Sequence, residues 1–179
     1  MTSPPSVVYE IDSRDRLRFV NGAWAEFARA NDADKLASPA LGRSLWDSVV
    51  DGNITDLYRA MFGRVRATGE TISFDYRCDS PDDKRFMTMI IEPAENRGIR
   101  LINKIWRIEP QSPGRFFQRF KQEPLSIPMC SFCADISLHE CWLPASDAIP
   151  ASLVFAEDLP LKVWPSVCPK CRARRGIDG

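Results

Sequence analysis

The feature that most constrains this chain is a pair of short cysteine motifs near its end. The first motif is C-S-F-C from Cys130 to Cys133, and the second is C-P-K-C from Cys168 to Cys171. Two cysteines three positions apart fit one tight turn and direct both sulfurs at one ion, and two such turns complete the tetrahedral four-thiolate site that structural Zn²⁺ prefers. The spacing therefore predicts a structural zinc site formed by Cys130, Cys133, Cys168 and Cys171.

Composition limits the classes of protein to which the chain can belong. Of its 179 residues, 44% are hydrophobic, which is enough for a packed core. Basic and acidic residues both number 24, and this neutral balance argues against a dedicated nucleic-acid or acidic-membrane binder. No apolar run reaches the roughly 18 residues that span a bilayer, and the N-terminus does not resemble a secretory signal. We therefore expect a cytoplasmic protein, whose reduced thiols bind metal rather than form disulfides.

The N-terminal part of the chain carries strand and helix patterns in a definite order. Strand-like segments at 7–11 and 17–20 predict a hairpin, and a helix follows after residue 22. Apolar residues recur at helical period over 54–65, and Gly69 ends this helix. Segments 71–78, 86–91 and 99–108 predict three strands joined by polar turns. The order predicts an α+β fold with one antiparallel sheet of five strands and helices packed on one face.

The sequence does not decide which face of the predicted strand 99–108 is buried. Leu101 and Ile105 share one phase, whereas Ile102, Trp106 and Ile108 share the other. Both phases carry apolar side chains, so the period of two does not decide between them.

Composition shifts towards the C-terminus. Residues 114–122 contain three phenylalanines and are predicted to form a short connecting helix, and half of the fourteen prolines fall after residue 123. We predict a sensor-like domain at 6–110, a linker or short helix at 111–123, and a zinc-binding module at 124–179. Because so small a module buries little apolar surface, the metal would decide whether it folds.

Residues 7–109 resemble a PAS domain. The resemblance lies in the opening hairpin, the V-N-G-A-W run at 20–24 that enters a helix, the L-G-R-S-L-W-D run at 41–47 before the long helix, and the closing three-strand meander. It implies a small cavity between sheet and helices for sensing a ligand, here a small hydrophobic one, and self-association into a homodimer. The contacts expected in the homodimer are any exposed side of Trp106 and the phenylalanines near 116–120. The candidate cavity residues, which could also simply fill the core, are Trp24, Phe27, Leu57, Met61, Phe74 and Tyr76.

Known PAS cofactors can be tested against the residues. Haem commonly needs an axial histidine, and His139, the single histidine, falls outside the PAS-like segment. Photoactive flavin PAS domains carry an Asn-Cys-Arg motif that this chain lacks. Cys78 is expected to be a small buried hydrophobe. Neither haem nor flavin is therefore expected.

The C-terminal module resembles a cysteine-rich tail that follows PAS or receiver-type modules in bacterial signalling proteins. The matching residues are 129–133, Trp142 and 167–171, although that tail carries a histidine where residues 164–167 read W-P-S-V. No activity is attached to the tail. His139 and Cys141 are only two positions apart, a poor spacing for joint chelation, so both are left out of the metal site.

Three functions are compatible with these patterns. The first is a non-enzymatic bacterial signalling protein, with a PAS domain for sensing or dimerisation and a zinc module that contacts an unknown protein partner. The second is a nucleic-acid-binding regulator that uses the zinc module and the basic run 172–175. The third is a thiol redox protein that uses one cysteine pair free of metal. We favour the first, and we expect no enzymatic activity.

Overall fold

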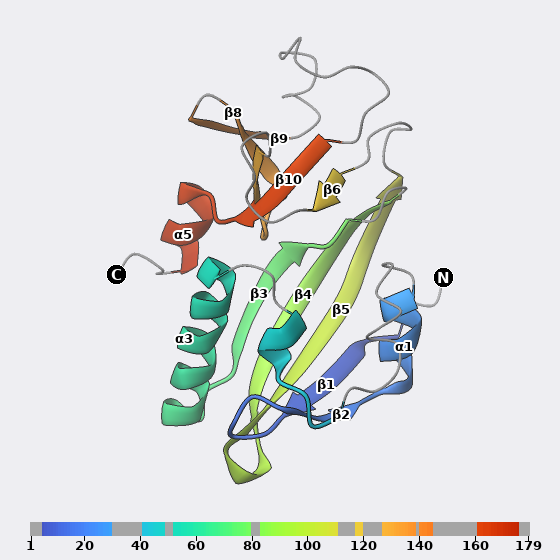
Figure 1. Ribbon diagram of the computed structural model, residues 1–179, viewed down its shortest axis with the longest axis vertical. Coiled ribbons are helices and arrows are strands. Elements are labelled where there is room, and N and C mark those ends of the chain that lie inside the picture. The colour runs from blue at the N-terminus through green and yellow to red at the C-terminus, as the bar shows by residue number, and fades with distance from the viewer. Residues whose placement is uncertain are drawn as a thin grey trace. The chain divides into compact units, whose positions relative to one another are not determined.

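The computed structural model describes residues 5–29, 41–48, 52–79, 83–110, 117–119, 127–138, 140–144 and 161–175. The chain divides into two compact units, and both are drawn in Figure 1. The first unit is Met1–Asp75 with Phe86–Arg107, and the second unit is Tyr76–Arg85 with Ile108–Gly179. The predicted domain limits stay predictions. The division differs from them chiefly at residues 76–85, which group with the C-terminal residues.

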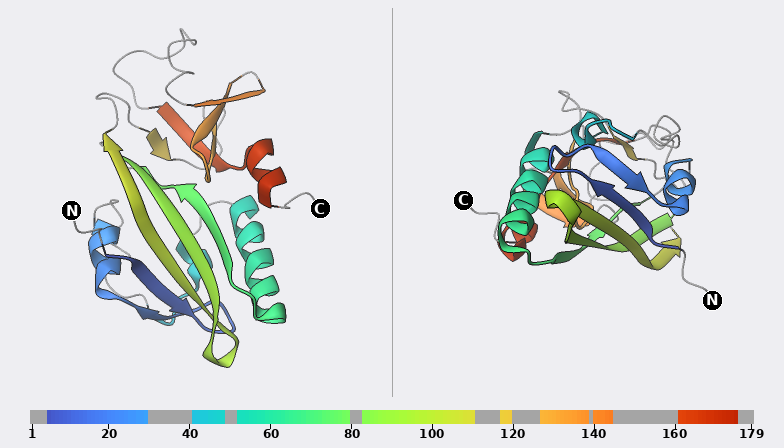
Figure 2. Two further views of the ribbon diagram at one scale, coloured as in Figure 1. Left: turned by 180° about the vertical axis from the view of Figure 1, so that it is seen from behind. Right: turned by 90° about the horizontal axis from the view of Figure 1, so that it is seen from below.

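Five strands form the first sheet, in the order β2-β1-β5-β4-β3. They are β1 (Val7–Ile11), β2 (Leu17–Val20), β3 (Ile72–Arg77), β4 (Asp83–Ala94) and β5 (Gly98–Pro110). Strands β3, β4 and β5 make the long meander that Figure 2 shows from behind. The helices described around this sheet are α1 (Gly22–Arg29), η1 (Leu45–Ser48), α3 (Gly52–Thr68) and η2 (Glu95–Arg97). The predicted α+β class and five-stranded antiparallel sheet are confirmed.

Helix α3 follows its apolar stripe. Leu57, Phe62 and Val65 are buried, as residues on one face of an amphipathic helix should be. The helix ends as predicted at Gly69, which has a φ of +72° and donates its N–H to the carbonyl of Val65 at 2.9 Å. Glycine suits this position because a side chain strains a left-handed backbone.

The structure decides which face of β5 is buried. Ile99 and Leu101 are fully buried, and on β4 the same holds for Met87 and Ile91. The opposite phase of β5 is open, since Trp106 is 54% exposed. The phase of Leu101 and Ile105 therefore faces the core.

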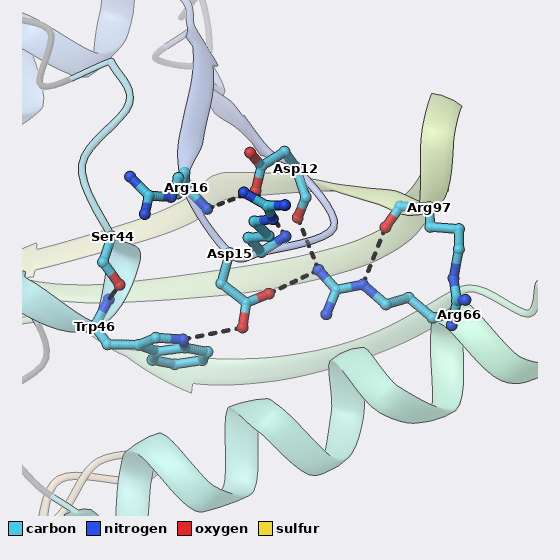
Figure 3. A network of polar contacts seen from close by, with 8 residues as sticks. Asp12, Asp15, Arg16, Ser44, Trp46, Arg66 and Arg97 are labelled. Carbon is cyan, nitrogen blue, oxygen red and sulfur yellow. Dashed lines mark hydrogen bonds and ion pairs between the residues drawn. The ribbon is translucent and has the colours of Figure 1, made fainter.

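A polar network ties the β1–β2 turn to two helices (Figure 3). Asp15, at a φ of +60°, accepts bonds from the indole N–H of Trp46 at 2.9 Å and from Arg66 at 2.7 Å. Arg66 also donates to the carbonyls of Asp12 and Arg97, both at 3.0 Å. Since Trp46 lies on η1 and Arg66 on α3, Asp15 fixes three segments that are far apart in the sequence.

A second ion cluster joins β1, β2 and β5. The buried carboxylate of Glu10 accepts bonds from Arg18 at 2.9 Å and from Arg100 at 2.7 Å. Burial by itself raises the pKa of Glu10, but the hydrogen bonds from Arg100 and Arg18 outweigh it and lower the pKa below its ordinary value.

This lowered pKa predicts how stability changes with pH. A carboxylate with a depressed folded-state pKa stabilises the fold above its unfolded pKa of about 4.3, and this contribution is lost as the pH falls through the folded pKa. Thermal melts from pH 6 down to pH 2 should show Glu10→Gln less stable than wild type at pH 6, by about 1–2 kcal/mol, with the gap closing below about pH 4. Glu70→Gln removes an exposed ion pair and should show no such gap. A gap that stays constant down to pH 2 would contradict this assignment.

Gly98 is predicted to tolerate no side chain. A Cβ there would lie 2.7 Å from the carbonyl oxygen of Ile11 and 3.0 Å from that of Glu95, and neither backbone atom can move aside easily. Gly98→Ala should therefore destabilise the protein by about 1–3 kcal/mol in denaturant titrations. The matched control is Gly63→Ala, which meets no atom within 4 Å in α3 and should stabilise by about 0.5–1 kcal/mol. Equal effects of the two changes would refute the prediction.

The second unit holds another five-stranded sheet, in the order β6-β10-β7-β8-β9. Strand β10 runs parallel to β6 and to β7, whereas β7, β8 and β9 pair antiparallel. Its elements are β6 (Phe117–Arg119), β7 (Ile127–Cys130), β8 (Asp135–Leu138), β9 (Cys141–Pro144), β10 (Leu161–Ser166) and α5 (Pro169–Arg175). Met129, Ile136 and Val163 form a small apolar core.

The predicted connecting helix at 114–122 is wrong where the structure describes it. Residues 117–119 form strand β6, because their backbone pairs with residues 161–163 of β10. A partner so distant in the sequence leaves no local pattern, and the phenylalanines fit a helix or a strand equally well. Within the described residues, no helix combines the length and apolar character needed to cross a membrane.

Candidate metal centre

The parallel pairing of β7 with β10 brings the two cysteine motifs together. Ser166, the last residue of β10, is in register with Cys130, the last residue of β7. Beyond them, the N–H of Ser131 donates to the carbonyl of Ser166 at 2.9 Å. Parallel strands that pair in register end at the same edge of a sheet. The two cysteine motifs therefore begin at the same edge of the second sheet.

Each motif then forms its own turn. The chain reverses between β7 and β8, where Ala134 adopts a φ of +60° and donates its N–H to the carbonyl of Cys130 at 2.9 Å. In the second motif Cys168 precedes α5, and Pro169 takes the first helical position, which suits its fixed φ and missing N–H. The N–H of Cys171 donates to the carbonyl of Cys168 at 3.0 Å.

The four sulfurs converge as the spacing predicts. Those of Cys130, Cys133, Cys168 and Cys171 all lie within 4.8 Å of one another. The sulfurs of Cys133 and Cys168, one from each motif, are 3.7 Å apart. A tetrahedral zinc site with Zn–S bonds of about 2.3 Å needs sulfurs about 3.8 Å apart. The sulfurs of Cys130, Cys168 and Cys171 are carried by buried residues and that of Cys133 by a half-buried one, so the donor set fits an enclosed structural ion.

The surroundings of the sulfurs favour the thiolate form at Cys130 but oppose it at Cys133 and Cys171. The pKa of Cys130 is lowered to about 5 by the hydrogen bond from the Cys133 thiol and by the backbone N–H groups of Cys168, Cys133 and Phe132, which outweigh its burial. The bond to Cys130, together with burial, raises the pKa of Cys133. Burial and the nearby Cys130 charge raise the pKa of Cys171 to about 12. A thiolate at Cys130 thus opposes ionisation of the neighbouring thiols. A divalent cation would remove this opposition, because it stabilises all four thiolates at once.

The basic residues of α5 contact the turns through backbone carbonyls. Arg172 donates to the carbonyl of Val167 at 3.4 Å, and Arg175 to that of Cys171 at 3.4 Å. The guanidinium of Arg175 also lies 3.9 Å from the ring centre of Phe132. Lys170 and Arg174 are exposed. Cations placed beside four thiolates would offset part of the negative charge of the site.

The remaining predicted site residues fall in different places. Cys141 is exposed and lies outside the sulfur cluster, whereas His139 lies outside the described residues. Cys78, expected to be buried, is half-buried in the second unit.

The six candidate cavity residues are not all in one unit. Tyr76 belongs to the second unit and the other five to the first. Leu57 is buried, and Trp24 stacks edge-on against Tyr9 with ring centres 4.9 Å apart. Burial raises the pKa of Tyr9. Phe27, Met61 and Phe74 are half-buried, as is Tyr76. That these six side chains line a cavity stays a prediction.

The sequence did not predict a contact between Arg77 and Phe132 beside the metal centre. The carbonyl of Phe132, inside the first cysteine motif, accepts the backbone N–H of Arg77 at 2.8 Å. The alternation over 71–78 predicted a strand but could not reveal this contact, because the contact depends on which strand occupies the sheet edge.

Comparison of the chain with protein-family models found no match, and comparison with curated proteins found no similar one.

Proposed function

We propose that this chain is a non-enzymatic bacterial signalling protein of the cytoplasm, in which a PAS-like sensory or dimerisation domain is combined with a structural zinc module that contacts a partner protein. The observation that carries the proposal is the cluster of four sulfurs within 4.8 Å of one another.

Zinc is the ion that suits the cluster best. Four thiolates in tetrahedral reach are a common donor set for structural Zn²⁺, and a closed set leaves no coordination position for a substrate. The metal therefore serves the fold of the second unit rather than a reaction. This is the main reason to prefer a binding module over an enzyme.

The element order of the first unit supports the PAS-like reading. An opening hairpin, intervening helices and a three-strand meander are what the resemblance implies, and the sheet contains these parts. A sensor of this kind has no catalytic group of its own, so its output passes through a partner.

Native mass spectrometry of freshly purified protein tests the proposal. We expect one Zn²⁺ per chain, with the four cysteines slow to react with a thiol reagent while the metal is bound. Cys141, which is exposed, should react at once and serves as the internal standard. A chain without metal, in which a cysteine pair reacts as readily as Cys141, would favour the thiol redox protein instead.

We also propose a homodimer formed through the open face of the first sheet. Trp106 is 54% exposed on this face, its ring lies 5.5 Å from that of Phe86, and Arg107 stacks over both rings. Exposed tryptophan flanked by arginine is typical of interface hot spots. Trp106→Glu should weaken the dimer at least about 30-fold, as measured by sedimentation. Leu41→Glu, at an exposed site in the loop before η1, is the control, and equal dimerisation of both variants would refute this contact.

A further inference from the structure

Strand β3 lies at one edge of the first sheet. Successive N–H groups along a strand point to opposite sides, so every second one on an edge strand lacks a neighbouring strand. The N–H of Cys78, directly after β3, donates to the carbonyl of Arg85 at 3.1 Å and thus points towards β4. The N–H of Arg77 must then point away from the sheet.

This outward N–H is the one that binds the metal-site turn. Its acceptor, 2.8 Å away, is the carbonyl of Phe132, which lies between Cys130 and Cys133. Arg77 and Phe132 both belong to the second unit, whereas β3 begins at Ile72 in the first. The cysteine turn therefore covers the last residue of β3, within the second unit.

Both sides of this contact are held firmly. On the strand side, the guanidinium of Arg77 pairs with Asp79, which also accepts the N–H of Arg85 at 3.2 Å. On the metal side, Phe132 is buried with Arg175 stacked on its ring, and Arg175 lies on the helix that carries Cys171. The position of the Phe132 carbonyl is thus set by two elements, and each of them holds cysteines of the site.

We propose that metal occupancy of the four-cysteine site controls the exposure of the Arg77 N–H at the end of β3. With the metal bound, the Cys130–Cys133 turn holds the Phe132 carbonyl against the Arg77 N–H. Without it the turn loses its closure, and the Arg77 N–H becomes open to solvent or to another extended chain. This inference rests on the proposed metal site and assigns that site a regulatory role: its occupancy decides whether the Arg77 N–H at the end of β3 is covered.

Amide exchange in the full-length chain tests the coupling. Exchange is measured by NMR on the zinc-loaded protein and again after EDTA treatment. We expect the Arg77 amide to exchange at least about tenfold faster without metal. Cys78, bonded within the hairpin, and Leu17, whose N–H donates to the carbonyl of Arg43 in the first unit, should change less than about twofold. Equal exchange of Arg77 in both states would overturn the inference, as would an equal rise at all three amides.

A pair of variants tests the same coupling in reverse. Because linkage is reciprocal, removing the Arg77 N–H should weaken zinc binding as much as zinc strengthens the contact. Arg77→Pro removes the N–H at an edge position that accepts proline, and Arg77→Ala removes the side chain alone. Arg77→Pro should bind zinc at least about tenfold more weakly than Arg77→Ala in a chelator competition. Equal affinities would contradict the coupling.

The native mass of the same samples separates the two proposals. A wild-type chain that carries no zinc overturns the metal site and the inference together. A chain that carries zinc but shows unchanged Arg77 exchange overturns the coupling alone.

Discussion

Replacement of Cys168 by serine is expected to abolish zinc binding and unfold the zinc-binding module that contains β7–β10 and α5. Cys168 is buried, its sulfur lies 3.7 Å from that of Cys133, and it accepts the N–H of Cys171 at 3.4 Å. The binding free energy of such sites is about 10–16 kcal/mol, far more than the small core around Ile136 can replace. Metal analysis together with NMR should show loss of zinc and collapse of the signals of β7–β10 and α5, while the signals of Cys78 and Arg85 remain.

Cys141→Ser is the matched control for this experiment. Cys141 is exposed and lies outside the sulfur cluster, so the variant should retain its zinc and its spectrum. If the Cys168 variant kept its metal with wild-type affinity, the four-sulfur site would be wrong. If the Cys141 variant lost metal, the ligand assignment would need a fifth cysteine.

Replacement of Asp15 by alanine should destabilise the first unit by about 2–4 kcal/mol. The change leaves the Arg66 guanidinium, only 15% exposed, without its carboxylate and removes the acceptor of the Trp46 indole. It also places a Cβ-bearing residue without a polar side chain at a φ of +60°. Denaturant titration measures the loss.

Two further variants show which part of Asp15 matters. Asp15→Asn tolerates the left-handed backbone and keeps an acceptor, so it should recover about half of the lost stability. Asp47→Ala, at an exposed acidic position of η1, should stay within about 0.5 kcal/mol of wild type. An Asp15→Ala variant as stable as the Asp47→Ala variant would show that the network in Figure 3 contributes nothing measurable.

The sequence predicted those parts of the fold that have a local signature. The apolar stripe from Ile54 to Val65, the alternation over 71–78 and the helix stop at Gly69 each depend on neighbouring residues, and each is found in the structure. The same holds for the four cysteines, because ligand spacing at a turn is a local property.

Features that depend on distant partners could not be predicted in this way. Strand β6 exists because of β10, and the buried phase of β5 depends on the neighbours of the whole strand. The Asp15 network joins residues from three elements, and no spacing in the sequence marks it. The contact between Arg77 and Phe132 is equally non-local, since it requires both the sheet order and the course of the cysteine turn.

The place of β10 in the second sheet has a consequence for protein synthesis. This strand comes last in the sheet's sequence but lies between β6 and β7. While the ribosome is still translating the preceding residues, β6 and β7 have no strand between them, and Cys130 and Cys133 wait for their partner pair. At about 5–20 residues per second, the 36 residues between Cys130 and its register partner Ser166 (166 − 130) take roughly two to seven seconds to make. Nascent chains would therefore carry an unfinished sheet for that time, a period in which chaperones or early metal capture would matter most.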